Sequence, residues 1–255
     1  MTDLAGPLDL TGRVVLVTGG AQGIGGAVGR LAASRGAAVV LADVSAERGE
    51  AAARRIRDAS GTARFVATDV RDADAVRALV EAIRDAHGRL DAVVCAAGVL
   101  KGPWQQPEEL SLDDFDLTQD VNVRGVFLCA RSATPLLEAS GRGVMVVVAS
   151  GAGVIGPSSS LAYGASKGGA NGLGMTLANH LAPRGIRVNV ICPGNIVTEL
   201  KLSVDIAAAE REGTSVDAAI ERANQEYGTP DGVARVIAFM LSDEADYLRG
   251  AVFTR

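Results

Sequence analysis

The stretch Val14-Val-Leu-Val-Thr18-Gly19-Gly-Ala-Gln-Gly23-Ile-Gly25 decides the fold of this chain. Its first five residues form a short apolar run, which is typical of a strand buried on both faces. The glycines that follow have the spacing Gly-x3-Gly-x-Gly, which allows a tight turn and close approach of a phosphate to a helix N-terminus. The sequence therefore predicts a strand, a phosphate-binding turn and a helix at the start of a βαβ unit.

Short apolar runs and longer helical stretches alternate along the rest of the chain. Strands are expected at Val14–Thr18, Ala38–Asp43, Arg64–Val70, Leu90–Ala97, Val144–Ser150, Arg187–Pro193 and Ala251–Arg255. Helices are expected at Ala27–Arg35, Ser45–Ser60, Asp72–His87, Leu112–Leu137, Ser159–Leu181, Glu199–Tyr227 and Pro230–Leu241. This alternation predicts an α/β fold: a three-layer, doubly wound Rossmann fold with a parallel sheet of about seven strands.

The composition is that of a globular protein. The 255 residues are 48% hydrophobic and 22% charged, with a net charge of −5, and no linker divides them, so a single domain over 1–255 is expected. A mildly acidic chain argues against nucleic acid or an anionic membrane as the main partner. No apolar run reaches the roughly 18 residues that span a bilayer.

Three cysteines and two histidines, with no Cys-x-x-Cys, make a metal site or a disulfide framework unlikely. The segment Met1–Leu10 carries two acidic residues and lacks the basic-then-apolar order of a signal peptide. Free cysteines without an export signal indicate a cytoplasmic location.

Asp43 ends the second predicted strand, about 20 residues after the glycine turn. A carboxylate at this point accepts hydrogen bonds from the adenosine ribose hydroxyls and repels a 2′-phosphate, so NAD is favoured over NADP. Gln22 within the turn is neutral and does not reverse this preference. The alternative is a solvated aspartate at a strand end, or the N-cap of the next helix.

Tyr163 and Lys167 are four residues apart on one predicted helix and share a face. An ammonium one turn away lowers the pKa of a phenol from its usual value near 10, which suits acid–base chemistry. Ser150 lies at the carboxyl end of the fifth predicted strand, where open α/β sheets bind their ligands. Asn122 is a polar residue in the middle of a helix and needs a partner. The alternatives are an exposed Tyr/Lys pair and a capping or kink asparagine.

Together these features resemble the short-chain dehydrogenase/reductase family, in its compact single-domain branch, over about residues 10–253. The turn at residues 18–25 matches the cofactor turn, and Asn122, Ser150, Tyr163 and Lys167 match the catalytic tetrad. The cofactor contacts that the resemblance and the turn imply are Gly19, Gln22, Gly23, Ile24, Gly25, Asp43, Asp69, Val70, Ala96, Gly98, Tyr163, Lys167, Pro193, Gly194, Ile196 and Thr198. No metal is implied.

The resemblance implies an NAD-dependent oxidoreductase that interconverts a secondary alcohol and a ketone by direct hydride transfer. Tyr163 would exchange a proton with the substrate oxygen, and Ser150 would hydrogen-bond that oxygen. Lys167 would lower the pKa of Tyr163 and bind the nicotinamide ribose, and Asn122 would hold a water that links Lys167 to solvent. The two long helices of the second half would pair between subunits of a homodimer or homotetramer.

One departure from the family lies after the fourth predicted strand, and further residues indicate where a substrate would bind. The family's Asn-Asn-Ala-Gly after the fourth strand is here Cys95-Ala-Ala-Gly98, which leaves only backbone groups for the cofactor. Residues 199–227 resemble the family's substrate lid. The residues that would line the substrate site are mostly apolar or small, which suggests a hydrophobic or cyclic secondary alcohol; they are Trp104, Ala152, Val154, Ile155, Pro157 and Asn195. Lys201 and Arg211 are lid cations that could meet a carboxylate.

Parts of the sequence also agree with three other functions. Residues 164–168 fit the Gly-x-Ser-x-Gly elbow of an α/β-hydrolase, but no strand precedes them and no acid separates Ser166 from His180. An extended-branch epimerase needs a further substrate domain. A non-catalytic NAD sensor or scaffold on the same fold remains open, although a sensor does not need the full tetrad.

Overall fold

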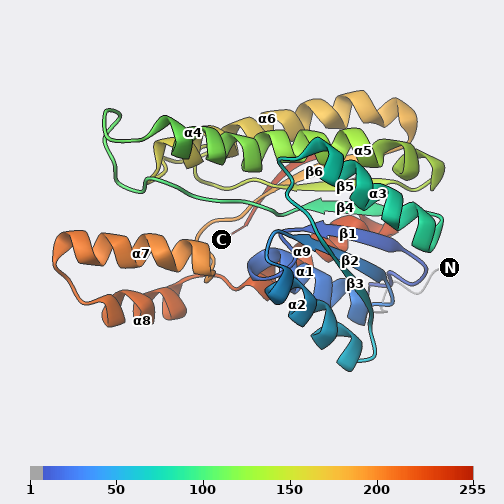
Figure 1. The fold of residues 1–255 in the computed structure, drawn as a ribbon, viewed down its shortest axis with the longest axis horizontal. Coiled ribbons are helices and arrows are strands. Elements are labelled where there is room, and N and C mark those ends of the chain that lie inside the picture. Colours follow the sequence, from blue (N-terminus) through green and yellow to red (C-terminus); the bar gives the residue numbers. More distant parts are fainter. Residues whose placement is uncertain (1–7, 255) are drawn as a thin grey trace.

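The computed structural model describes residues 8–254, and its centre is one parallel sheet (Figure 1). The seven strands lie in the order β3-β2-β1-β4-β5-β6-β7, and each neighbouring pair is parallel. Their bounds are β1 Val14–Thr18, β2 Ala38–Asp43, β3 Thr62–Ala67, β4 Ala92–Cys95, β5 Val144–Val148, β6 Arg187–Cys192 and β7 Gly250–Phe253. The predicted doubly wound α/β fold is confirmed.

Helices cover both faces of this sheet (Figure 1). Helices α3, α5 and α6 contribute to one apolar core, and α1, α2 and α9 contribute to the other. The helices are α1 Gly23–Ser34, α2 Ala46–Asp58, α3 Ala73–His87, α4 Leu112–Gln119, α5 Gly125–Ala139, α6 Leu161–Leu181, α7 Glu199–Glu212, α8 Val216–Glu226 and α9 Pro230–Leu241. None of the helices in the described part of the chain is long and apolar enough to cross a membrane.

Strand β1 explains why the apolar runs do not alternate with polar residues. Val14 and Leu16 pack into the core with α3, α5 and α6, while Val15 and Val17 pack into the core with α1, α2 and α9. Successive side chains of a strand point to opposite faces, so a strand between two helix layers needs apolar residues at every position.

The structure corrects the bounds of several predicted elements. Strand β3 covers residues 62–67 instead of 64–70, because β2, its partner, ends at Asp43 and the pairing ends with it, so Asp69 and Val70 lie in the following connection. Helix α1 begins inside the glycine turn. The predicted helix over 199–227 is two helices, since Gly213 (φ 65°) takes the left-handed conformation that caps α7. Arg255, assigned to the last strand, and most of Met1–Leu10 lie outside the described residues.

Helices α7 and α8 extend away from the sheet on the side of the strands' carboxyl ends (Figure 1). This pair lies between β6 and α9 in the chain. The long connection from β4 to α4 runs out above α7 on the same side (Figure 1). One edge of the sheet therefore carries the loops that follow the strands, the α7–α8 pair and the connection from β4 to α4.

Asp91 joins three strands at the opposite edge. Its backbone bonds both Val14 and Val144, the first residues of β1 and β5, and its carboxylate accepts the Val14 N–H at 2.8 Å. The fully buried carboxylate also accepts bonds from Arg89 (2.6 Å) and Arg142 (2.9 Å). Burial raises the pKa of Asp91, but the bonds from Arg89, Val14 and Arg142 outweigh burial, so the pKa lies below its ordinary value.

We expect Asp91→Asn to lower the free energy of unfolding at pH 7 by about 3 kcal/mol, because it leaves a buried acceptor neutral beside two guanidinium groups. A carboxyl with a lowered pKa stabilises the fold above its unfolded pKa near 4 and loses this effect as the pH falls. The gap between wild type and variant should therefore narrow below pH 4 in urea denaturation. Asp85→Asn, at an exposed position of α3, is the control, and an equal small loss in both variants would contradict the assignment.

Candidate active site

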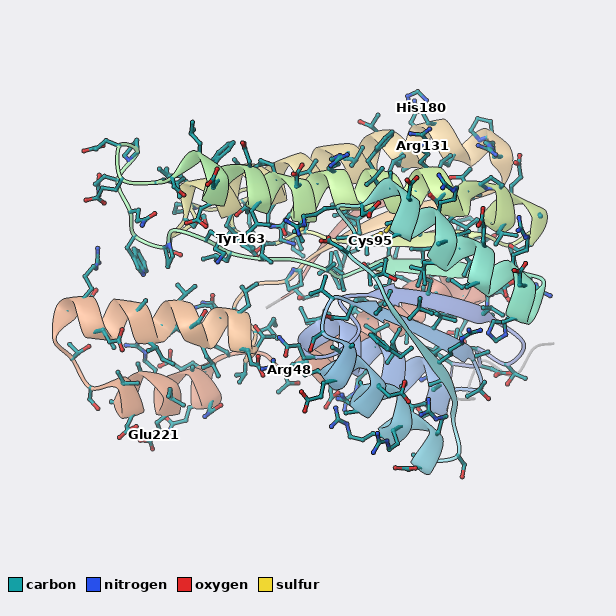
Figure 2. The ribbon with its side chains drawn as sticks, viewed as in Figure 1. Arg48, Cys95, Arg131, Tyr163, His180 and Glu221 are labelled. Carbon is teal, nitrogen blue, oxygen red and sulfur yellow. The ribbon has the colours of Figure 1, made fainter. Side chains whose placement is uncertain are left out.

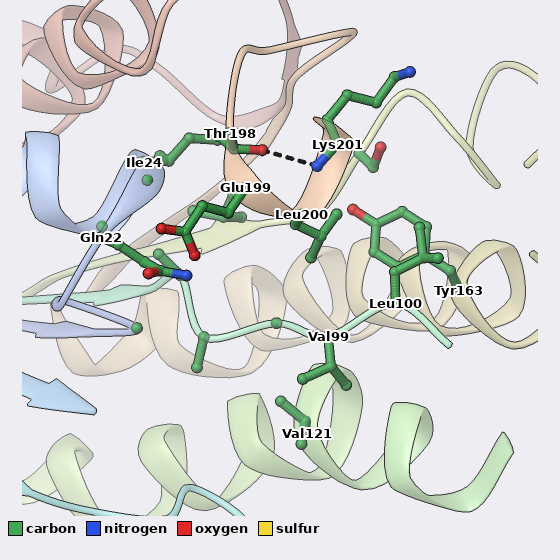
Figure 3. Close-up of a pocket in the computed structure, with 18 of the residues that line it drawn as sticks. Gln22, Ile24, Val99, Leu100, Val121, Tyr163, Thr198, Glu199, Leu200 and Lys201 are labelled. Atoms are coloured by element: carbon green, nitrogen blue, oxygen red, sulfur yellow. Dashed lines mark hydrogen bonds between the residues drawn. The ribbon is translucent and has the colours of Figure 1, made fainter. Parts of the chain in front are cut away.

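A cleft of about 830 Å³ lies at the carboxyl ends of the strands. It sits at the point where the strand order reverses between β1 and β4, the usual ligand site of open α/β sheets. Every residue that the sequence assigns to cofactor binding lines it, as does Ser150. Figure 3 shows part of its wall, where Tyr163 lies beside Leu200 and Lys201 at the start of α7.

The glycine turn forms one end of the cleft. Its backbone is packed so closely that Gly19 and Gly25 could not carry side chains. A Cβ atom on Gly25 would lie 2.2 Å from the carbonyl oxygen of Gly19, and one on Gly19 would lie 2.7 Å from the Ala96 carbonyl. Helix α1 begins within the turn, at Gly23, so its first N–H groups and the positive end of its dipole face the cleft. This cradle fits the pyrophosphate of a dinucleotide.

Asp43 occupies the adenosine end of the predicted cofactor site. One of its oxygens accepts the Ala21 N–H at 3.1 Å, and the other accepts the Ser45 N–H at 3.0 Å. The carboxylate therefore fixes the glycine turn and the start of α2 at the same time. Each oxygen has a further lone pair, so the carboxylate retains acceptor capacity for ribose hydroxyls.

Two arginines at this end were missed in the sequence analysis. Arg48 Nη1 donates to Gln22 Oε1 at 2.5 Å and to Glu199 Oε2 at 2.8 Å, which ties α2 to the first residue of α7 (Figure 2). Arg71 forms a fork onto Asp69, and this bond holds the pKa of Asp69 below its ordinary value. Neither arginine belongs to a motif. The Arg48 contacts span 26 and 151 residues and leave no local signal, whereas Arg71 bonds a residue only two positions before it.

Ser150, Tyr163 and Lys167 come together on the cleft wall, as predicted. Ser150 lies two residues after the end of β5, and its side chain is close enough to Tyr163 to lower the pKa of the phenol. Tyr163 and Lys167 are one turn apart on α6, with Lys167 Nζ 5.5 Å from the centre of the tyrosine ring. Lys167 Nζ also donates to the Val148 carbonyl at 2.8 Å, which fixes the ammonium at the end of β5.

Burial shifts the two titrating groups of this cluster in opposite directions. It raises the pKa of Tyr163 to about 12, although the hydrogen bond from Ser150 lowers it. Burial lowers the pKa of Lys167 to about 8, and nearby Cys192 raises it. The sequence predicted a lowered pKa for Tyr163; in the structure the direction is opposite, because desolvation of the phenolate outweighs the bond from Ser150 and Lys167 is not among the groups that shift it.

Asn122 lies behind the cleft and does not line it. It occupies a short π-helix, Asp120–Arg124, between α4 and α5. Its side chain exchanges two hydrogen bonds of 2.9 Å with the backbone of Val99 and donates to Ser166 Oγ at 2.8 Å. The partner that a mid-helix asparagine needs is therefore the loop after β4. Widened helical turns of this type are frequent at functional sites.

The part of the cleft that the sequence analysis assigned to a substrate is mostly apolar. Of the residues named from sequence, Trp104, Ala152, Pro157 and Asn195 line it, whereas Val154 and Ile155 do not. Lining residues that sequence reasoning missed are Val99, Leu100, Leu117, Val121, Leu200 and Val204. Lys201, on the same wall, already pairs with Asp205 and donates to the Tyr227 hydroxyl at 3.2 Å.

We predict that Lys167→Met removes a pH dependence of stability. Folded Lys167 titrates near 8 and an unfolded lysine at 10.5, so between these values the unfolded chain binds more protons and stability rises with pH. In urea denaturation, the free energy of unfolding of the wild type should rise by about 2 kcal/mol more than that of the variant between pH 8 and pH 10. Lys101→Met, at an exposed site, should follow the wild type; parallel curves for all three would refute the shifted pKa.

Comparison with known proteins agrees with this site. The model of the family described as "short chain dehydrogenase" matches residues 13–209. Cis-4-hydroxycyclohexanecarboxylate dehydrogenase of Sinomonas cyclohexanicum is 38% identical over 94% of this chain and 93% of that protein. D-threitol dehydrogenase of Mycolicibacterium smegmatis is 38% identical over 95% of this chain and 90% of that protein.

Among solved structures, levodione reductase superposes with a TM-score of 0.87 at 32% identity, covering 95% of each chain. The relatives match nearly the whole chain and are named dehydrogenases or reductases. The family model and the relatives bear out the resemblance inferred from the motifs. This chain belongs to the short-chain dehydrogenase family of oxidoreductases, whose members bind a nicotinamide cofactor, NAD or NADP.

Proposed function

We propose that this protein is an NAD(H)-dependent dehydrogenase/reductase that interconverts a secondary alcohol and a ketone, with Tyr163 as general acid and base. The observation that supports this most is the meeting of the Ser150 hydroxyl, the Tyr163 phenol and the Lys167 ammonium on one wall of the cleft that holds the glycine turn. Acid–base groups thereby face the same space as the phosphate cradle.

The residues present fit a nicotinamide dinucleotide. The glycine turn and the start of α1 would hold the pyrophosphate, Asp43 the adenosine ribose, and the segment from Pro193 to Thr198 the nicotinamide end. When bound, the nicotinamide supplies a hydride donor or acceptor. The protein's own contribution is binding, orientation and proton transfer.

Tyr163 holds the proton that the reaction needs. With a pKa of about 12 its phenol is protonated at neutral pH and can protonate a carbonyl oxygen. Ser150 would donate a hydrogen bond to the same oxygen, and the Lys167 ammonium, 5.5 Å from the centre of the tyrosine ring, would bind the nicotinamide ribose. In alcohol oxidation Tyr163 accepts the proton instead and must first be deprotonated. We therefore expect the rate of alcohol oxidation to increase as the pH rises.

The substrate that fits best is a secondary alcohol or ketone with an apolar body. The substrate half contains the aliphatic side chains of Leu100, Leu200 and Val204. One relative is named for a hydroxylated cyclohexane carboxylate, which has a saturated ring beside the reacting hydroxyl. We infer that α7 and α8, residues 199–227, act as a lid over this half and exclude water.

Our proposal includes a homodimer or homotetramer in the cytoplasm. Large apolar side chains are exposed on α4, α5 and α6, the helices that the sequence analysis assigned to subunit pairing; they include Leu112, Phe127, Leu161 and Met175. We infer that these exposed side chains are covered by a second subunit. A mass from light scattering tests the oligomeric state.

A non-catalytic NAD sensor is less well supported. A sensor requires the cradle and Asp43 but not a buried ammonium beside a tyrosine and a serine. Burying an ammonium is unfavourable, so its presence beside Tyr163 favours a catalytic role. A sensor would bind NADH and turn over no member of a panel of secondary alcohols.

We expect Tyr163→Phe to bind NADH with unchanged affinity but to turn over about a thousandfold more slowly, because only the proton-transferring hydroxyl is lost. Binding is measured by NADH fluorescence, and turnover by NADH absorbance with cyclohexanol and cis-4-hydroxycyclohexanecarboxylate. Tyr247→Phe is the matched control, since Tyr247 is fully exposed. Near-wild-type turnover by Tyr163→Phe would refute the proposed acid–base role.

We also expect wild-type protein to bind NADH at least tenfold more tightly than NADPH, because the Asp43 carboxylate repels a 2′-phosphate. Asp43→Asn keeps an acceptor for Ala21 or Ser45 but removes the charge, and should reduce this preference about tenfold. Asp58→Asn, exposed at the end of α2, should leave it unchanged. Equal affinities of the wild type for the two cofactors would rule out the assignment of Asp43.

A further inference from the structure

Trp104 has an unusual position in the connection between β4 and α4. Its backbone is in the left-handed region (φ 66°), which among the described residues is shared by only one other non-glycine residue, Ser60. Its side chain lines the cleft, and 39% of the residue is exposed. It is also the chain's single tryptophan. A non-glycine backbone in this strained conformation persists only where neighbouring residues hold it in place.

Two hydrogen bonds fix this connection to the start of α6. The Trp104 N–H donates to the Ser159 carbonyl at 2.7 Å. The Ser160 hydroxyl donates to the Lys101 carbonyl at 2.6 Å and accepts the Tyr163 N–H at 3.1 Å, which makes it the N-cap of α6. The backbone that carries the indole is therefore fastened to the residues that directly precede Tyr163.

Helix α7 holds the indole from the other side. The guanidinium of Arg211 lies 5.0 Å from the centre of the Trp104 ring. Arg211 is ten residues beyond Lys201, so its backbone lies about 15 Å further along the axis of α7. Leu200 and Val204 of α7 and Leu100 of the connection line the same cleft as Tyr163 and Trp104. The indole is thus part of the wall of an apolar cleft and is held by a residue far along α7.

We propose that Trp104 is a specificity-determining residue: its indole forms the outer wall for the apolar body of the substrate, and Arg211 holds the indole in that position. This inference rests on the proposed function and adds a selection by size to it. A ring or longer apolar group on the reacting carbon reaches Trp104, whereas a very small alcohol stays near Tyr163. Shortening the indole should therefore penalise large apolar substrates only.

The kinetic test compares cyclohexanol with 2-propanol. We expect Trp104→Ala to lower kcat/KM about tenfold for cyclohexanol, mainly through KM, and to change kcat/KM less than twofold for 2-propanol, because the lost contact is apolar area on the substrate. Trp104→Phe should restore part of the loss. Tyr247→Ala, at a fully exposed aromatic residue, is the control. Equal losses with both alcohols, or none, would overturn the inference.

A second measurement needs no turnover, so it separates this inference from the proposed function. Fluorescence of the single tryptophan reports on Trp104 alone, and NAD⁺ with cyclohexanone forms a complex that cannot react. We expect cyclohexanone to reduce acrylamide quenching of the NAD⁺-loaded protein at least twofold. Arg211→Gln should increase quenching without ligand, whereas Arg222→Gln, exposed on α8, should not. If cyclohexanone does not change the quenching, the inference is overturned even if the protein oxidises alcohols.

Discussion

The contact between the glycine turn and the end of β4 is the constraint on which the rest of the site depends. Gly25 meets the carbonyl of Gly19, and Gly19 meets the backbone of Ala96 and Ala97, at distances that exclude any side chain. This contact brings β1 and β4 together where the strand order reverses, and it directs the start of α1 into the cleft. The cradle and the loop after β4 consequently share one opening.

Behind this opening, buried polar groups hold the catalytic wall in place. Asn122 bonds Val99 and Ser166, and so joins the loop after β4 to α6, while Lys167 is anchored on Val148. A Cβ on Gly98 would lie 3.4 Å from Asn122 Oδ1 and 3.5 Å from Lys167 Nζ, so the loop packs closely against both side chains. Burying an ammonium at this point lowers stability, which is common where function sets the residue; the proton transfer proposed for Tyr163 is such a function.

Helix α7 contacts the rest of the fold at both of its ends, through an ion pair at one end and a cation–π contact at the other. At its start Glu199 pairs with Arg48 beside the glycine turn, and near its end Arg211 lies over Trp104. The first contact belongs to the cofactor half of the cleft and the second to the substrate half. Because exposed ion pairs contribute little to stability, such contacts position the helix more than they stabilise the fold.

Local patterns were enough to predict the strand–helix alternation, the glycine turn and the one-turn spacing of Tyr163 and Lys167, because each follows from periodicity or from the conformational demands of glycine. Every residue that the sequence assigned to cofactor binding lines the cleft. The tertiary structure alone decided the direction of the Tyr163 pKa, since burial depends on the whole surroundings of a group. It alone decided the partners of Arg48, Asn122 and Trp104, because these contacts join segments far apart in the chain and leave no periodic signal.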